Sequence, residues 1–106
     1  GGAEVLNKYL KSLNCDVHCI IGMMANKNHK EYISYFKNIK SITTIDIPNT
    51  PGALDGKKLK EKFNSIQNVQ YNTSIEEAIK SIPLSKNDII IITGSLYLAS
   101  EVLKLN

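Results

Sequence analysis

The sequence predicts an α/β fold of three layers, in which a mainly parallel sheet is covered by helices on both faces. Short β-branched runs alternate with helical segments of about ten residues, which is the pattern of successive βαβ units. Two of the runs, VHCII (17–21) and DIIIIT (88–93), are almost entirely apolar, as strands buried on both faces must be. The 106 residues suit a single domain, 1–106.

The first half of the chain predicts helix, strand, helix and strand. AEVLNKYLKSL (3–13) places its leucines on one helical face, and the strand 17–21 follows it. HKEYISYFKNI (29–39) again has helical spacing. ITTIDI (42–47) is rich in strand residues, and Pro48 ends it because proline cannot donate to the ladder.

A loop and a further helix and strand follow. PNTPGALDG (48–56) combines two prolines with two glycines, which is turn chemistry. KKLKEKFNSI (57–66) spaces its apolar residues as a helix face, and Asp55 is placed to cap that helix. NVQYN (68–72) is a short, polar strand that suits a sheet edge.

The last third predicts helix, strand and helix. TSIEEAIKSI (73–82) opens with Ser74 and Glu77 at the spacing of a capping box. The strand 88–93 comes next, and LYLASEVLKL (96–105) then has helical spacing of its leucines and valine.

Composition narrows the function classes. The net charge is +3, and all 13 basic residues are lysines, which argues against nucleic acid because base and phosphate contacts favour arginine. No apolar run approaches the ~18 residues of a membrane helix, so we expect no membrane partner. Two cysteines, Cys15 and Cys19, indicate neither a disulfide framework nor a zinc site. We expect a cytoplasmic monomer.

Ligands of open parallel sheets bind beyond the carboxyl ends of the strands. The two apolar strands end in Gly22 and Gly94, so the site is expected there. Ser95 either caps the last helix or contacts an anion at its amino end. Lys27 either reaches an anionic substrate or is solvated, and Asn28 can cap the helix that follows.

Other candidate sites have simpler interpretations. His18 lies inside a strand and is expected in the core or on a sheet face, and His29 is expected to be exposed in the first turn of its helix. The lysine-rich segment 57–62 is expected to be a solvated face. Neither a phosphate-binding loop nor a G-x-G-x-x-G motif is present in the sequence. We assign no catalytic residue and no metal ligand.

Three blocks carry a family resemblance: GGAEVL (1–6), IIGMMANKNHKEYI (20–33) and the segment 74–103, which ends in NDIIIITGSLYLASEVL. In order and spacing they resemble the C-terminal domain of folylpolyglutamate synthase and dihydrofolate synthase, in the Mur ligase superfamily. Gly-Ser-Leu-Tyr is the most specific block. The family's Asp-Lys-Asp stands here as Asn26-Lys27-Asn28, so only the lysine is kept. The arginine often found in the family's proline-rich loop is missing.

The resemblance implies a Rossmann-like domain with strand 88–93 beside 17–21, then 42–47, then 68–72 at the edge. It also implies an ATP-dependent ligase that adds glutamate to folate or dihydropteroate through an acyl phosphate. ATP and Mg²⁺ would be held mainly by the enzyme's own N-terminal ATPase domain, which is not in this chain, so the isolated domain is predicted to be inactive.

The resemblance further implies site residues in this chain. Gly94, Ser95 and Tyr97 would bind the incoming glutamate, and Lys27 and Asn28 would lie near ATP and substrate. Two alternatives stay open. One is a non-catalytic domain that senses a nucleotide or another ligand, although the clustered acidic residues of a receiver domain are missing. The other is the C-terminal domain of a different Mur-type amino acid ligase.

Overall fold

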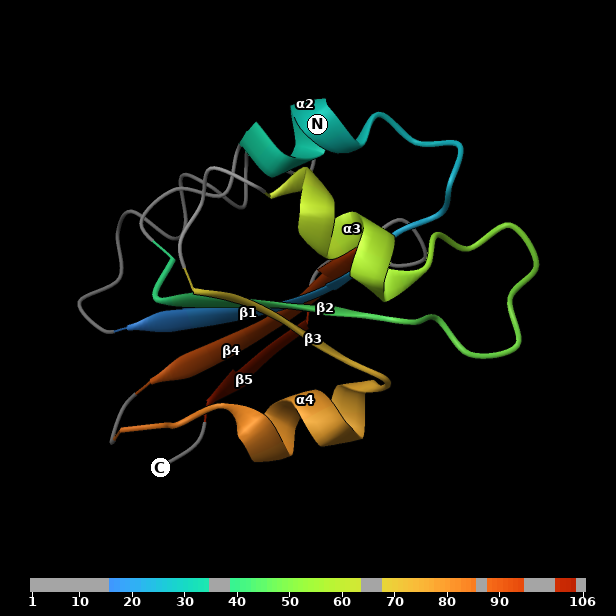
Figure 1. The fold of residues 1–106 in the computed structure, drawn as a ribbon. Helices are drawn as coiled ribbons and strands as arrows, with labels where there is room; N and C mark the ends of the chain where they lie inside the picture. Colours follow the sequence, from blue (N-terminus) through green and yellow to red (C-terminus); the bar gives the residue numbers. More distant parts are fainter. Residues whose placement is uncertain (1–15, 35–38, 64–67, 86–87, 95–100, 105–106) are drawn as a thin grey trace.

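A five-stranded sheet forms the centre of the molecule (Figure 1). The structure, a computed structural model, describes residues 16–34, 39–63, 68–85, 88–94 and 101–104. The strand order is β3-β2-β1-β4-β5. The strands are β1 (Val17–Gly22), β2 (Ser41–Ile45), β3 (Val69–Asn72), β4 (Ile89–Gly94) and β5 (Glu101–Lys104).

Four of the strands are parallel and lie in the predicted order. β1 pairs with both β4 and β2, and β2 pairs with β3. The two apolar strands are therefore central, where helices cover both of their faces. The short polar strand β3 lies at an edge, as the sequence predicts.

The predicted helix 96–105 is wrong over residues 101–104. These form β5, which runs antiparallel to β4, with Ile92 opposite Glu101 and Ile89 opposite Lys104. β4 needs a hydrogen-bonded neighbour on its second edge, because unpaired backbone groups beside a buried strand are costly. Pairing with β4 therefore decides the conformation of residues 101–104, although their sequence has the spacing of a helix. The rest of this segment and the predicted helix 3–13 lie outside the described residues.

Helices cover both faces of the sheet, as predicted. α2 (His29–Ser34) and α3 (Gly56–Lys62) lie on one face, and α4 (Ile75–Ser81) lies on the other (Figure 1). Both predicted caps are present. The Asp55 carboxylate accepts the Lys57 N–H at 2.8 Å, and the Ser74 hydroxyl accepts the Glu77 N–H at 3.2 Å.

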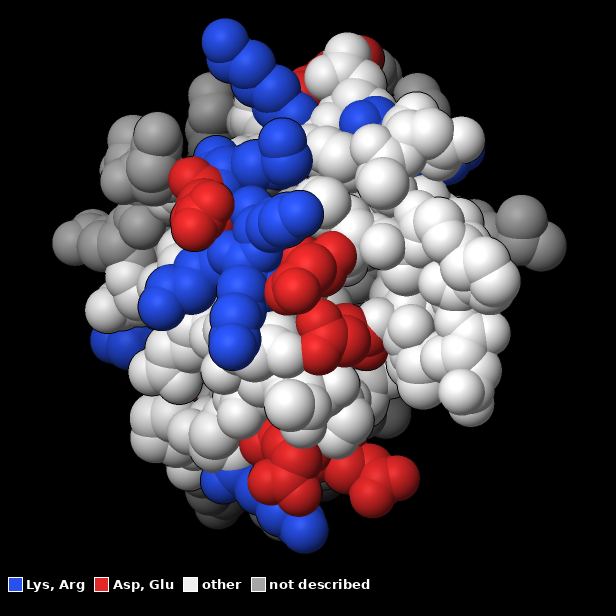
Figure 2. Space-filling view, turned by 45° about the vertical axis from the view of Figure 1, so that its right-hand side comes forward, with Lys and Arg blue, Asp and Glu red and all other residues white. Residues whose placement is uncertain are grey.

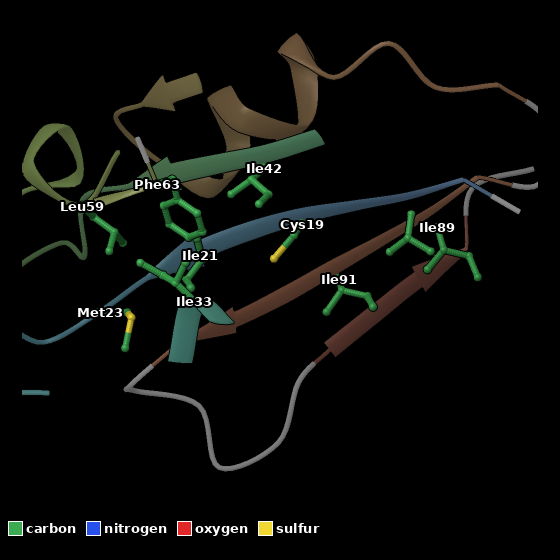
Figure 3. Packing of buried hydrophobic residues seen from close by; sticks show 10 residues of the cluster. Cys19, Ile21, Met23, Ile33, Ile42, Leu59, Phe63, Ile89 and Ile91 are labelled. Carbon is green, nitrogen blue, oxygen red and sulfur yellow. The ribbon is translucent and has the colours of Figure 1, made fainter. Parts of the chain in front are cut away.

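The core is divided by the sheet into two clusters. Side chains of the central strands alternate, so Cys19 and Ile21 face α2 and α3, whereas Ile20 faces α4. Leu59 and Phe63 cover the first cluster, and Figure 3 shows how their side chains meet those of the strands. The first cluster consists of Val17, Cys19, Ile21, Met23, Ile33, Ile42, Leu59, Phe63, Ile89 and Ile91, and the second of Ile20, Ile45, Ala78, Ile82, Ile90 and Ile92.

Candidate functional site

The carboxyl ends of β1 and β4 meet at a pair of glycines. Gly22 is the register partner of Gly94, and both residues are buried. Gly94 has a φ of +150°, and a Cβ atom added to it would lie 1.7 Å from the carbonyl oxygen of Gly22. Backbone therefore contacts backbone where the sequence predicts the site, and only glycine fits at position 94.

The loop after β1 is bonded to the proline-rich loop after β2. The Leu54 N–H donates to the Met23 carbonyl at 2.8 Å, and the Ala25 N–H donates to the Gly52 carbonyl at 2.8 Å. An isolated antiparallel bridge between the two loops lies beside these bonds. The two loops therefore form one unit at the carboxyl edge of the sheet.

His29 and Asn28 fix the start of α2. The prediction that His29 is exposed is wrong: the residue is buried, and its Nε2–H donates to the Met24 carbonyl at 2.7 Å. The first turn of α2 faces the preceding loop instead of solvent. The predicted cap is confirmed, since Asn28 Oδ1 accepts the Glu31 N–H at 3.1 Å and Asn28 Nδ2 donates to the Glu31 carboxylate at 3.0 Å.

Lys27 is exposed at the mouth of an open pocket. The residues that line the pocket are Lys27, Asn28, His29, Lys30 and Lys62. The structure thus brings Lys27 beside two further lysines, whereas Gly94 belongs to the buried glycine pair. Ser95 and Tyr97 lie outside the described residues.

Tyr32 connects α2 to the end of β4. Its hydroxyl is hydrogen-bonded to the hydroxyl of Thr93 at 2.5 Å, and burial raises the pKa of Tyr32. Thr93 directly precedes Gly94, so this bond ties the helix after the Lys27 loop to the predicted substrate turn. The sequence analysis did not predict this pair. The sequence feature that could have indicated it is Thr93, a hydroxyl residue at the end of a run of isoleucines.

A second polar cluster lies at the carboxyl ends of β2 and β3. The Asp46 carboxylate accepts a hydrogen bond from the Gly56 N–H at 2.8 Å. It accepts a second hydrogen bond from the hydroxyl of Tyr71. The bond to Asp46 is the main cause that raises the pKa of Tyr71 to about 12. The Lys57 ammonium lies 5.7 Å from the centroid of the Tyr71 ring, within cation–π range. Lys57, Lys60, Glu61 and Tyr71 line an open pocket here.

The opposite edge of the sheet holds a buried network around His18. Its Nδ1 is 2.7 Å from the Ser41 hydroxyl, and its Nε2 is 3.1 Å from the Asp88 carboxylate. The Ser85 N–H also donates to Asp88, and this bond, followed by the one from His18, lowers the pKa of Asp88. The prediction of a core histidine is confirmed. His18 is only 2% exposed and cannot meet a substrate, so the Ser-His-Asp set is structural.

The carboxyl edge is suited to binding anions. Three lysines line the pocket at Lys27, and two lysines line the other pocket together with Glu61 and Tyr71. Within the described ranges, no group of three or more His, Cys, Asp or Glu side chains could hold a metal ion. None of the helices described there is long and apolar enough to cross a membrane.

Comparisons with known proteins point in one direction. The family model described as "Mur ligase, glutamate ligase domain" matches residues 2–96. Among solved structures, the folylpolyglutamate synthase of Thermotoga maritima is 25% identical, with a TM-score of 0.74 over 92% of this chain. A bifunctional folylpolyglutamate synthase/dihydrofolate synthase of Yersinia pestis, complexed with AMPPNP and a Mn ion, is 14% identical over 89%, with a TM-score of 0.69.

The FolC protein of E. coli, in complex with ADP, is 19% identical over 87% of this chain, with a TM-score of 0.66. No match was found among curated proteins. The chain spans only 23%, 23% and 22% of the lengths of these three solved chains.

Proposed function

Because this chain belongs to the Mur ligase family of glutamate ligase domains, we propose that it is the C-terminal domain of an ATP-dependent ligase that joins glutamate to folate or dihydropteroate. The observation that carries the proposal is the family match over residues 2–96. The 25% identity to a folylpolyglutamate synthase over 92% of the chain supports the folate branch.

The proposed reaction has two steps. The γ-phosphoryl group of ATP is transferred to a carboxylate of the folate or dihydropteroate, which gives an acyl phosphate and ADP. The amine of glutamate then attacks the acyl carbon, the C–O bond to phosphate breaks, inorganic phosphate leaves, and the amine loses a proton. The products are an amide, ADP and phosphate.

This chain would supply the glutamate side of the site. Gly94, Ser95 and Tyr97 bind the incoming glutamate, and the backbone contact at the glycine pair fixes the strand end from which they follow. Lys27 and Asn28 lie near ATP and substrate. Asn28 acts there through the loop it holds, because both polar atoms of its side chain bond Glu31.

ATP and Mg²⁺ would be bound mainly by the enzyme's N-terminal ATPase domain, where the metal would neutralise the charge of the phosphates. The residues described here offer lysines for anions, three of which line the pocket at Lys27. The chain alone is therefore expected to be inactive. Phosphate release from ATP by the isolated domain, dependent on both glutamate and folate, would contradict this.

The Ser95→Ala variant of the full-length protein tests the substrate contact. A hydroxyl bonded to a carboxylate contributes ~1.5–3 kcal/mol, so the KM for glutamate is expected to rise about ten- to hundred-fold, with little change for ATP. If Ser95 only caps a helix, stability falls by ~0.5–2 kcal/mol and the glutamate kinetics stay the same. Steady-state kinetics and thermal melting of one variant separate the two interpretations.

The alternatives are tested by the choice of substrates. A panel of amino acids, assayed with ATP and either folate or dihydropteroate, should show turnover with glutamate. Turnover with another amino acid would assign the chain to a different Mur-type ligase. Ligand-induced stabilisation without any turnover would favour a sensing domain.

A further inference from the structure

α2 has a charged outer side and an inner side that faces the core. Lys30 and Glu31 are exposed, whereas Ile33 is buried in the first core cluster and Tyr32 packs against that cluster. The neighbouring helix α3 is similar. Its lysines are exposed, which confirms the predicted solvated face, and Figure 2 shows lysines gathered there with acidic side chains beside them. The contacts that connect α2 to the sheet are therefore made from its inner side.

The inner side of α2 is bonded to the ends of two strands. His29 is buried and donates to the Met24 carbonyl in the loop after β1, at 2.7 Å. Tyr32 lies one helical turn later on the same face and is hydrogen-bonded to the Thr93 hydroxyl at the end of β4, at 2.5 Å. One helix thus connects the loop that carries Lys27 with the strand that leads into the proposed glutamate turn.

The Thr93 hydroxyl is a polar group in an apolar strand. It follows four consecutive isoleucines, and Thr93 is only 2% exposed. A buried hydroxyl costs free energy unless it is hydrogen-bonded, and a valine would fill the same space without that cost. Tyr32 supplies a hydroxyl that stays protonated, because burial raises its pKa. Packing alone does not require a hydroxyl at position 93, so the bond itself calls for a role.

Thr93 is also the last side chain before a glycine in an unusual conformation. Gly94 has a φ of +150°, which residues with a Cβ atom rarely adopt. A glycine has no side chain that packing could hold, so the direction of the chain beyond it depends on how its neighbours are fixed. On the preceding side that neighbour is Thr93, which is bonded to Tyr32.

We propose that Tyr32 is a positioning residue for the incoming glutamate: by holding Thr93, it sets the turn at Gly94 relative to the Lys27 loop. The proposal rests on the function proposed above. Tyr32 acts through the turn and not by contact with the substrate. Residues that bind a substrate need support from the side chains behind them, because a small displacement of the binding groups weakens their contacts.

The test measures the kinetics of full-length variants with ATP, folate and glutamate. Tyr32→Phe and Thr93→Val each delete one hydroxyl of the pair. The KM for glutamate should therefore rise about three- to ten-fold, with less than about a two-fold change in the KM for ATP. The two effects should not add in the double variant, because both substitutions remove the same bond. Thr93→Ser keeps the hydroxyl and should stay close to the wild type.

Ser41→Ala is the matched control. It also deletes one hydroxyl, which is bonded to His18 at 2.7 Å, at the amino ends of the strands. Its melting temperature should fall comparably, while its KM for glutamate stays unchanged. A purely structural Tyr32 would give the same result as this control. The proposal is therefore overturned if Tyr32→Phe lowers the melting temperature and leaves the KM for glutamate unchanged, or raises both KM values equally.

Failure of the proposed function has a different signature. If the wild type joins a different amino acid to folate, the same comparison is made with that amino acid. If it joins none, the proposed function fails, and hydrogen exchange in the same full-length variants decides about Tyr32. The amides of Thr93 and Gly94 should exchange about three- to ten-fold faster in Tyr32→Phe than in Ser41→Ala, because opening the end of β4 no longer breaks the bond between the two hydroxyls. Equal exchange rates in the two variants overturn the positioning role.

Discussion

The amino ends and the carboxyl ends of the parallel strands, called here the amino edge and the carboxyl edge of the sheet, are held together by different kinds of bond. At the amino edge, the side chain of His18 in β1 is hydrogen-bonded to Ser41 in β2 and to Asp88 just before β4. At the carboxyl edge, backbone contacts join Gly22 to Gly94 and the loop after β1 to the proline-rich loop, and the bond between Tyr32 and Thr93 adds a side-chain tie. His18 and Asp88 at the first edge are buried, whereas Lys27 at the second edge is exposed.

This difference separates stability from function. A buried polar network is stable only when every member is bonded, so the amino edge tolerates little change. At the carboxyl edge Lys27 faces solvent, where ligands of parallel sheets bind. Variants at the two edges should therefore differ in what they damage.

The largest effect is expected from Gly94→Ala. Its Cβ would lie 1.7 Å from a carbonyl oxygen, at a φ of +150° that disfavours alanine. The strand ends must separate, so we expect a loss of about 4 kcal/mol or more in the free energy of unfolding. Gly52→Ala is the matched control: φ is +84°, but the nearest atom is the end of the Met24 side chain at 3.3 Å, and the loss should be about 1–2 kcal/mol. Urea unfolding measures the loss in both variants. Equal losses would show that the close contact between Gly22 and Gly94 adds nothing to the cost of a positive φ.

His18→Ala should cost less, about 2–3 kcal/mol, because it leaves the buried Asp88 and the half-buried Ser41 without one partner each. The comparison also predicts what stays constant. In the full-length protein the KM for glutamate should not change, since His18 lies at the edge away from the site. If the His18→Ala variant stayed stable but had a raised KM for glutamate, the amino edge would also contribute to function, which contradicts the comparison.

Tyr32→Phe should remove about 1 kcal/mol, the usual net value of one hydrogen bond. Because its partner is the Thr93 hydroxyl, a double-mutant cycle with Thr93→Val isolates the bond. We expect a coupling energy of about 0.5–1.5 kcal/mol from chemical denaturation. Additive losses would mean that the bond does not hold the carboxyl edge.

The smallest effect concerns pH. Asp88 ionises below its usual pKa of 3.8 in the folded state, so its contribution to stability is present above that pKa and is lost as pH falls through the lowered one. Asp88→Asn should therefore flatten the acid side of the stability profile below pH ~4. Urea midpoints measured between pH 2 and 7 check this. An unchanged slope would show that other carboxylates dominate acid unfolding.

Patterns that are local in the sequence predicted most of the fold. The isoleucine runs of β1 and β4 identified the central strands, and Asp55 and Ser74 marked helix starts, because burial and capping act within a few residues. β5 was mistaken for helix, since its conformation follows from the open edge of β4.

The candidate site was predicted only in part, for the same reason. Lys27 was singled out because it lies in the loop after a buried strand, and its role in a site stays a prediction. The bond between Tyr32 and Thr93 spans 61 positions, and the burial of His29 depends on how a loop folds against the first turn of a helix. Neither leaves a local pattern in the sequence.

The pairing of β1 with β4 has a consequence for how the chain is synthesised. Val17 of β1 pairs with Ile89 of β4, so β1 can pair with β4 only after another 72 residues have been synthesised. At about 5–20 residues per second, translation separates the two partners by roughly 4–14 s. During that interval one hydrogen-bonding edge of an apolar strand has no partner. A ribosome carrying this domain should therefore recruit chaperones before β4 emerges and release them afterwards.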